Sequence, residues 1–330
     1  MNPFYSKTVR GAALLSAALA ASAAVQAEEI AIQVDGNLPV YVRAEGVAGN
    51  LSSVGSDTLN NLMTLWAEEF RKQYPNVNIQ VEGKGSSTAP PALIAGTSQL
   101  GPMSRAMKRE EKNEFEGTYG FKPTEIQVAL DALAVFVNKD NPVTALSTQQ
   151  VDAIFSKTRK AKAPNDIQTW GQAGVTDPAW AAKPISSYGR NSASGTYGFF
   201  KETVLLKGDY KDTVKEQPGS ASVVLGITED QGAIGYSGIG YRTSGVKALA
   251  LSKAGGEAYA PSYANVLSGK YPVWRPLYIY IVKEPGKPLS PVVKEFLKTI
   301  LSKKGQEIVV KDGFYPLSAE MVAKEVKKLE

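Results

Sequence analysis

Two spacings of apolar residues alternate along the chain, and together they predict its secondary structure. Between residues 54 and 75, apolar side chains recur every three or four residues, which places them on one face of a helix. These positions are Leu59, Leu62, Trp66 and Phe70. A short strand-like run, 77 to 81, follows directly. The alternation continues through the chain, so we expect an α/β fold rather than an all-helical or all-strand one.

Two longer apolar runs, 126 to 138 and 274 to 283, predict the strands that organise this fold. A continuous apolar run is typical of a strand covered on both faces, as in a largely parallel sheet. The length of the first run also suits a crossover between lobes. The Lys-rich end of the chain is expected to be a solvated helix face. Four tryptophans are expected to pack in the core or on lobe surfaces: Trp66, Trp170, Trp180 and Trp274.

The amino-terminal segment has the features of a cleavable export signal. Lys7 and Arg10 give a basic start, residues 11 to 25 are almost wholly small or apolar, and Ala27 completes a signal-peptidase site. The apolar run is too short for a comfortable membrane span. We therefore predict a signal peptide at 1–27 and a soluble, exported mature chain, with a retained amphipathic anchor as the alternative.

Charge and residue usage exclude several classes of function. The chain has 37 Lys and Arg against 32 Asp and Glu, and without Lys7 and Arg10 the net charge is 35 − 32 = +3. Without long like-charge runs, this balance predicts no nucleic-acid binding. The chain has no cysteine and no histidine, which excludes disulfides, a Ser-His-Asp hydrolase and the usual zinc or copper ligand sets. We predict no metal and no cofactor, and the length suggests two domains.

Three turns rich in Gly, Ser and Thr each lie between a strand-like segment and a predicted helix. They are 55 to 58 (GSDT), 83 to 88 (GKGSST) and 191 to 196 (NSASGT). A helix N-terminus offers unpaired backbone N–H groups and the positive end of the helix dipole, so it holds anions well. Ser and Thr also cap ordinary helices, which is the alternative for each turn alone. Because ligands of α/β folds bind outside the carboxyl ends of strands, we favour a shared anion site.

Arg190 is the charged residue beside the third turn. Its planar fork can hold two oxygens of an anion at once, whereas the alternative is a surface arginine in a dispensable salt bridge. Hydrogen bonds to a charged group contribute roughly 1.5–3 kcal/mol each. A handful of them, reduced by ordering costs, reaches the ~8 kcal/mol of micromolar affinity. The sequence contains no GxxxxGK[ST] phosphate loop, and Lys84 is expected to be a solvated loop residue.

Six segments, in their order along the chain, resemble the phosphate-binding proteins of high-affinity phosphate ABC transporters. They are SVGSDTLNNLMTLWAEEF, EGKGSSTAPPAL, GPMSRAMK, ALDALAVFVNKDNP, GRNSASGTYGFFKE and GAIGYSGIGY. The resemblance covers nearly the whole mature chain. It implies a type II periplasmic-binding-protein fold, with two α/β lobes, two crossovers and a ligand cleft between the lobes. The first lobe would be 50–129 with 274–330, the second 130–273, and 28–49 an N-terminal segment.

The resemblance also implies a function and a site. The protein would capture inorganic phosphate in the periplasm, with the cell exterior as a second location, and deliver it to the membrane permease of an ABC transporter. It would act as a monomer, with no enzymatic activity and no catalytic residue. The matching phosphate ligands are Ser56, Thr58, Ser86, Arg190, Ser194, Gly195 and Thr196.

Two positions depart from the family pattern. Family members carry an aspartate that accepts the proton kept by phosphate and so rejects sulfate; this chain aligns Ser104 there, and Ser192 at a second family aspartate. We predict Ser104 as a donor and Asp131 as a substitute acceptor. The alternative for Asp131 is a hydrogen bond to its own backbone at a bend. Rival functions are the binding of sulfate or molybdate and a phosphomonoesterase, and the missing histidine counts against the latter.

Overall fold

The computed structural model describes residues 32–330, so the predicted signal peptide and residues 28–31 lie outside the described residues. The strands are β1 (Gly49–Val54), β2 (Val77–Glu82), β3 (Gly101–Met103), β4 (Thr124–Asn138), β5 (Ala145–Ser147), β6 (Ser186–Arg190), β7 (Lys215–Gln217), β8 (Ala233–Gly238), β9 (Val246–Ala248), β10 (Ala250–Ser252) and β11 (Trp274–Ile281). The α-helices are α1 (Asn60–Gln73), α2 (Ala89–Ile94), α3 (Arg109–Tyr119), α4 (Thr148–Phe155), α5 (Pro178–Ala181), α6 (Gly195–Thr203), α7 (Ser220–Glu229), α8 (Tyr263–Leu267), α9 (Pro291–Ile300), α10 (Lys303–Lys311) and α11 (Ala319–Lys327). Short 3₁₀ helices are η1 (Asp57–Leu59), η2 (Ser86–Thr88) and η3 (Ile239–Tyr241). Within residues 32–330, none of the helices has the length and apolar character that crossing a membrane requires.

The main sheet has seven strands in the order β3-β11-β4-β8-β6-β7, with β9 also paired to β4. Two separate parallel pairs, β1 with β2 and β5 with β10, complete the strand content. The two long apolar runs form β4 and β11, as predicted, and β4 is buried along most of its length. Its neighbours β11, β8 and β9 all run antiparallel to it, so the expected largely parallel pairing is wrong for this strand. Burial reflects the layers that cover a strand, and it does not fix the direction of the strand's neighbours.

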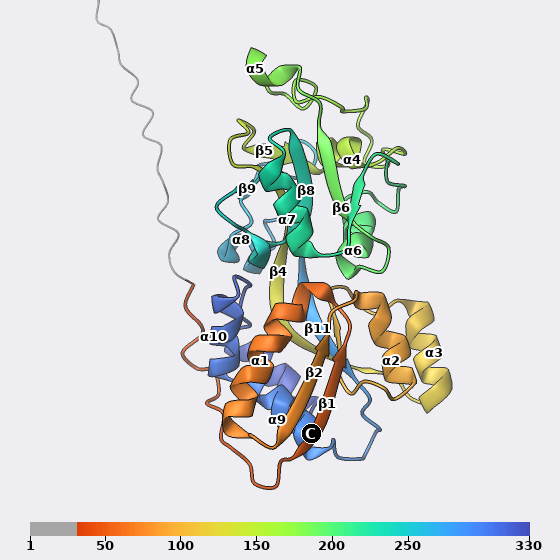
Figure 1. Cartoon of the computed structure of the whole chain (residues 1–330), viewed down its shortest axis with the longest axis vertical. Helices are drawn as coiled ribbons and strands as arrows, with labels where there is room; N and C mark the ends of the chain where they lie inside the picture. The colour runs from red at the N-terminus through yellow and green to blue at the C-terminus, as the bar shows by residue number, and fades with distance from the viewer. Residues whose placement is uncertain (1–31) are drawn as a thin grey trace, which may run out of the picture. The chain divides into compact units, whose positions relative to one another are not determined.

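Strand β4 joins the two lobes of this α/β fold. Its first part, up to Ala132, pairs with β11, and its second part, from Leu133, pairs with β8 and β9. Figure 1 shows β4 and β11 running between one group of elements that includes α1, α2, α3 and α9 and another that includes α4, α6, α7 and α8. The ladder of β4 and β11 shifts register between Leu277 and Tyr278, which places a bulge in this connecting ribbon.

Helix α1 shows how the apolar spacing builds the core. Leu62, Trp66 and Phe70 are fully buried, and the Trp66 indole N–H donates to the carbonyl of Gly305 at 2.9 Å. Full burial of a large apolar side chain contributes roughly 1.5–3 kcal/mol, so this face anchors α1 to its lobe. The other tryptophans are Trp170, which is fully buried, Trp180, which packs partly buried on the core, and Trp274, which is 36% exposed. Packing therefore accounts for Trp66, Trp170 and Trp180.

Asp312, just after α10, is half-buried and is expected to make stability depend on pH. Burial raises the pKa of its carboxyl from 3.8 to about 6, although the Asn61 amide donates a hydrogen bond to it. Because the folded-state pKa lies above the unfolded one, the folded state binds more protons, and stability falls as pH rises from about 4 to about 6. Relative to the parent, Asp312→Asn should therefore change the free energy of unfolding little at about pH 4 and increase it at about pH 7.

Thermal unfolding at these two pH values tests this prediction. The matched control is Asp140→Asn, because Asp140 is exposed and forms an ion pair with its neighbour Lys139. If the change in Tm caused by Asp312→Asn is the same at both pH values, the raised pKa of Asp312 is contradicted.

Candidate functional site

The three hydroxyl-rich turns, far apart in sequence, meet at one place. The N–H of Gly85 donates to the carbonyl of Gly55 at 2.8 Å, which joins the second turn to the first. The N–H of Ser87 donates to the carbonyl of Ala193 at 3.1 Å, which joins the second turn to the third. Each turn follows the carboxyl end of a strand, β1, β2 or β6. This is the position at which α/β folds bind their ligands.

Three buried serines from these turns and the loop after β3 form a cluster of neutral donors. The Ser56 hydroxyl donates to Ser104 Oγ at 3.0 Å, Ser86 Oγ and Ser104 Oγ are 3.3 Å apart, and the Ser104 N–H donates to Ser86 Oγ at 3.0 Å. Gly195 faces the cluster, and a Cβ on it would lie 2.2 Å from Ser86 Oγ and 2.6 Å from Ser104 Oγ. Position 195 therefore requires glycine, because any side chain would collide with the two hydroxyls.

Two threonines and a helix cap extend the donor cluster. Thr58 Oγ1 and Thr196 Oγ1 are 3.0 Å apart, and Arg275 Nη2 donates to Thr196 Oγ1 at 3.0 Å. Ser194 is the N-cap of α6: its Oγ accepts from the N–H groups of Thr196 at 3.1 Å and Tyr197 at 3.3 Å. Ser194 therefore makes the contacts of an ordinary helix cap, which was the alternative interpretation of this turn. Its own O–H group is still able to donate to a ligand.

Arg190 ends β6 and is only 2% exposed, which rules out the alternative of a surface arginine. Its Nη1 donates to Ser220 Oγ at 2.7 Å, and its Nη2 donates to the carbonyl of Pro218 at 3.1 Å. Among residues 32–330, no acceptor faces its Nε–H. Burial lowers the pKa of Arg190, and the carboxylate of Asp57 opposes that effect. A buried guanidinium with an unused N–H is suited to an anion.

The carboxylate beside Arg190 comes from Asp57, whose Oδ2 lies 3.1 Å from Arg190 Nη1. Ser192, which aligns with the second family aspartate, is exposed. Sequence reasoning missed Asp57 as the partner of Arg190, although the GSDT turn contains it between two predicted ligands. The pairing links positions that lie far apart in sequence, so the turn alone did not indicate it.

Asp131 forms a buried ion pair with Arg275, a residue that sequence reasoning also missed. Asp131 Oδ2 accepts from Arg275 Nε at 2.9 Å and Nη2 at 2.8 Å, and Oδ1 accepts from the Ile239 N–H at 3.0 Å. These partners lie on β11 and η3, so the alternative of a bond to its own backbone at a bend is wrong. Burial raises the pKa of Asp131, and Arg275 opposes that rise. A charged residue within the apolar run 274 to 283 was the available signal.

Arg275 also reaches the donor cluster, because its Nη1 donates to the carbonyl of Ser104 at 2.8 Å. Burial lowers the pKa of Arg275, Asp131 opposes this effect, and the nearby positive charge of Arg190 adds to it. Two buried cations therefore stand close enough to influence each other. Lys84, by contrast, is 68% exposed beside Glu82, as expected for a solvated loop residue.

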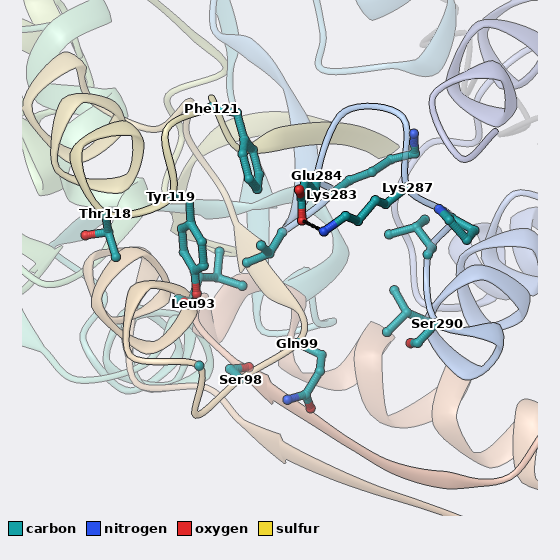
Figure 2. Close-up of a pocket in the computed structure, with 15 residues that line it drawn as sticks. Leu93, Ser98, Gln99, Thr118, Tyr119, Phe121, Lys283, Glu284, Lys287 and Ser290 are labelled. Atoms are coloured by element: carbon teal, nitrogen blue, oxygen red, sulfur yellow. Dashed lines mark hydrogen bonds and ion pairs between the residues drawn. The ribbon is translucent and has the colours of Figure 1, made fainter.

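Two cavities lie outside the donor cluster, and one of them borders Ser194. A cavity of about 570 Å³, shown in Figure 2, is lined by aromatic rings such as Tyr119 and Phe121. Lys287 and Glu284, which form an ion pair at 2.9 Å, also line it. None of the predicted ligands lines this cavity. A cavity of about 310 Å³ borders Ser194 and is lined by several basic side chains, Arg105, Lys108, Lys201 and Lys207. The case for the predicted ligands therefore rests on their chemistry and burial rather than on empty volume.

Comparisons with known proteins show which sequences and solved structures this chain is similar to. The family model described as a PBP superfamily domain matches residues 42–304. The phosphate-binding protein PstS of Pseudomonas aeruginosa is 55% identical over 96% of this chain and 98% of its own length, and protein SphX of Synechococcus elongatus is 32% identical over 81% of this chain and 77% of its own. One similar solved structure is that of a Clostridium perfringens protein named as a phosphate ABC transporter substrate-binding protein, with phosphate bound. Its TM-score is 0.69 and its sequence identity is 27%, and the match covers 82% of this chain and all of that one. The chain therefore belongs to the PBP superfamily and, within it, to the family of PstS phosphate-binding proteins.

Proposed function

We propose that this protein captures inorganic phosphate between its two lobes in the periplasm and delivers it to the permease of an ABC transporter. The names of its relatives support this proposal. The observation that carries it is Arg190, a buried guanidinium whose Nε–H has no acceptor among residues 32–330, beside a cluster of buried hydroxyls. A buried donor left unpaired costs roughly 1–3 kcal/mol, so a ligand rich in oxygens would remove that cost.

The proposed ligands have distinct roles. Arg190 supplies the cationic clamp, and Gly195 lets the third turn approach the serines closely. The hydroxyl donors are Ser56, Thr58, Ser86, Ser104, Ser194 and Thr196. Most donors are neutral, and each guanidinium is paired with a carboxylate, so the ligand's own charge would be balanced mainly by dipoles.

Asp131 is the proposed acceptor for the proton that phosphate retains. Its burial, which raises its pKa, supports this role, because a carboxyl with a higher pKa takes up a shared proton more readily. Its two oxygens already accept three hydrogen bonds, from Arg275 and the Ile239 N–H. A carboxylate offers about four acceptor sites, which leaves about one for the ligand.

The proposal keeps the predicted lobe boundaries, 50–129 with 274–330 and 130–273. The change of pairing partner of β4 between Ala132 and Leu133, close to the predicted boundary, supports them, because the strand stops pairing with β11 there and begins to pair with β8. Closure of the lobes would be a hinge motion at β4 and β11. The protein would act as an exported monomer after loss of 1–27.

Isothermal titration with phosphate, arsenate, sulfate and molybdate at two pH values tests the proposal. We expect phosphate and arsenate to bind and sulfate to bind at least about a hundredfold more weakly, because sulfate has no proton to give to an acceptor. Equal or tighter binding of sulfate or molybdate would assign the site to another oxyanion. Sustained multiple-turnover hydrolysis of a phosphate ester, abolished by Ser194→Ala, would instead make the protein a phosphomonoesterase.

Thr58→Ala should weaken phosphate binding by about 1–2 kcal/mol, or roughly fivefold to thirtyfold in Kd. The variant loses one neutral hydroxyl, whereas the paired cations stay in place. Thr118→Ala is the matched control, since Thr118 is exposed and its hydroxyl donates to the carbonyl of Glu114 within α3. A Kd within twofold of the parent's for Thr58→Ala would remove Thr58 from the site.

A further inference from the structure

Asp57 is in the first hydroxyl-rich turn, but its carboxylate contacts groups of the second lobe. Its Oδ2 accepts from both the N–H and the hydroxyl of Ser220, each at 2.9 Å, across 163 residues of sequence. The same oxygen lies 3.1 Å from Arg190 Nη1. One carboxylate oxygen thus holds the start of α7 and the end of β6 together.

These contacts complete a helix end that its own residues leave open. Helix α7 is ten residues long, and its N-cap is Gly219, which has no side chain to accept a hydrogen bond. Asp57 accepts the Ser220 N–H in place of a local cap, and its negative charge lies at the positive end of the helix dipole. A Cβ on Gly219 would come 3.3 Å from Asp57 Oδ1, so the glycine permits this close approach.

The backbone of the same turn is held from the second lobe as well. The Tyr241 hydroxyl in η3 donates to the carbonyl of Asp57 at 2.9 Å and lies 3.3 Å from the carbonyl of Thr58. Contacts to the side chain and backbone of Asp57 therefore come from β6 itself, from α7, which follows β7, and from η3, which follows β8.

Asp57 and a bound anion use different parts of Arg190. Asp57 and Ser220 face Nη1, and the Pro218 carbonyl faces Nη2, whereas Nε–H is the group without an acceptor among residues 32–330. An anion on Nε does not need to displace the carboxylate. The three contacts to Nη1 and Nη2 also fix the plane of the guanidinium, and with it the direction of Nε–H.

We propose that Asp57 is a positioning residue that clasps the two lobes: it caps α7 from the other side of the cleft and orients Arg190 toward the ligand. Opening of the lobes breaks the Ser220 and Arg190 contacts, so the clasp slows opening and ligand release. Its effect on affinity rests on the proposed phosphate site, whereas its effect on closure does not.

The test compares the parent, Asp57→Asn, Ser220→Ala and the double variant, with Asp140→Asn as the matched exposed control. Phosphate release is followed by stopped flow, and affinity by titration. Because the chain has no cysteine, Lys72→Cys and Lys157→Cys introduce a unique label pair at exposed sites, 71% and 52% accessible, one in each lobe. Distances between these labels, with and without phosphate, report the closed population.

We expect Asp57→Asn to speed phosphate release by about tenfold to hundredfold, with an association rate within about threefold of the parent's. Ser220→Ala should give a smaller increase, and the double variant should resemble Asp57→Asn, because both act through one contact. The closed population should fall at phosphate concentrations that do not saturate the site.

Three results would overturn the clasp. One is a release rate of Asp57→Asn within twofold of the parent's, and another is a loss of affinity caused by slower association alone. The third is independent action of Asp57→Asn and Ser220→Ala in the double variant. If the parent binds no phosphate, the proposed function fails, and the label distances of ligand-free Asp57→Asn and parent still decide whether Asp57 closes the lobes.

Discussion

Arg190→Ala is expected to weaken phosphate binding by about 3–5 kcal/mol, or roughly two to nearly four orders of magnitude in Kd. The anion would be buried without its adjacent cation, and Asp57 would lose its ion-pair partner in the same place. Isothermal titration measures the loss. Thermal unfolding in the absence of ligand shows whether the variant is folded at the temperature of the titration.

A second variant separates the charge of Arg190 from its shape, and a third is the exposed control. Arg190→Lys keeps a positive charge but not the planar fork, so we expect an intermediate affinity. Arg109→Ala removes a guanidinium that is 86% exposed and should leave Kd unchanged. If Arg190→Ala binds phosphate as the parent does, Arg190 is not the clamp, and the buried donor cluster does not hold the anion.

The second large effect concerns stability. Arg275→Met should lower the free energy of unfolding by about 3–5 kcal/mol, because Asp131 is left as an uncompensated charge at a position that is 0% exposed. Loss of Arg275 should raise the pKa of Asp131 further. A folded-state pKa above the unfolded one makes the folded state bind more protons, so the deficit should shrink as pH falls and grow as pH rises.

Urea unfolding of the single and double variants measures this effect. Asp131→Asn keeps an acceptor for the Ile239 N–H, so the double variant of Asp131→Asn with Arg275→Met retains that contact and removes the unpaired charge. We expect the double variant to be more stable than Arg275→Met alone. Strict additivity of the two substitutions, or a deficit that is the same at acidic and neutral pH, would contradict a buried ion pair.

The sequence predicted those parts of the fold that depend on local patterning. The three-to-four spacing of α1 and the long apolar runs of β4 and β11 indicate helix and strand directly, because burial of one face imposes a period. The direction of the neighbours of β4 was not predictable in this way. Both parallel and antiparallel neighbours leave a covered strand apolar, and the antiparallel arrangement depends on the path of the chain through both lobes.

Site residues were predictable where they lie in a turn of distinctive composition, and they were missed where their role depends on a contact with a distant segment. The hydroxyl-rich turns can be identified from their composition, and the structure brings Ser56, Ser86 and Thr196 together. Asp57 and Arg275 were missed, because their roles come from partners that lie more than a hundred residues away. The sequence marks Arg275 only as a charge within the apolar run 274 to 283, and neither residue's partner can be identified from the local pattern.

The bulged ribbon of β4 and β11 has a mechanical consequence. Two strands cross-linked by a hydrogen-bond ladder resist stretching and sliding, whereas they flex with little resistance perpendicular to their common plane. The register shift at Leu277 and Tyr278 interrupts the ladder and adds local twist, so we expect the ribbon to bend most easily there. If the lobes close as proposed, we therefore expect them to rotate about this point of the ribbon rather than to slide past each other.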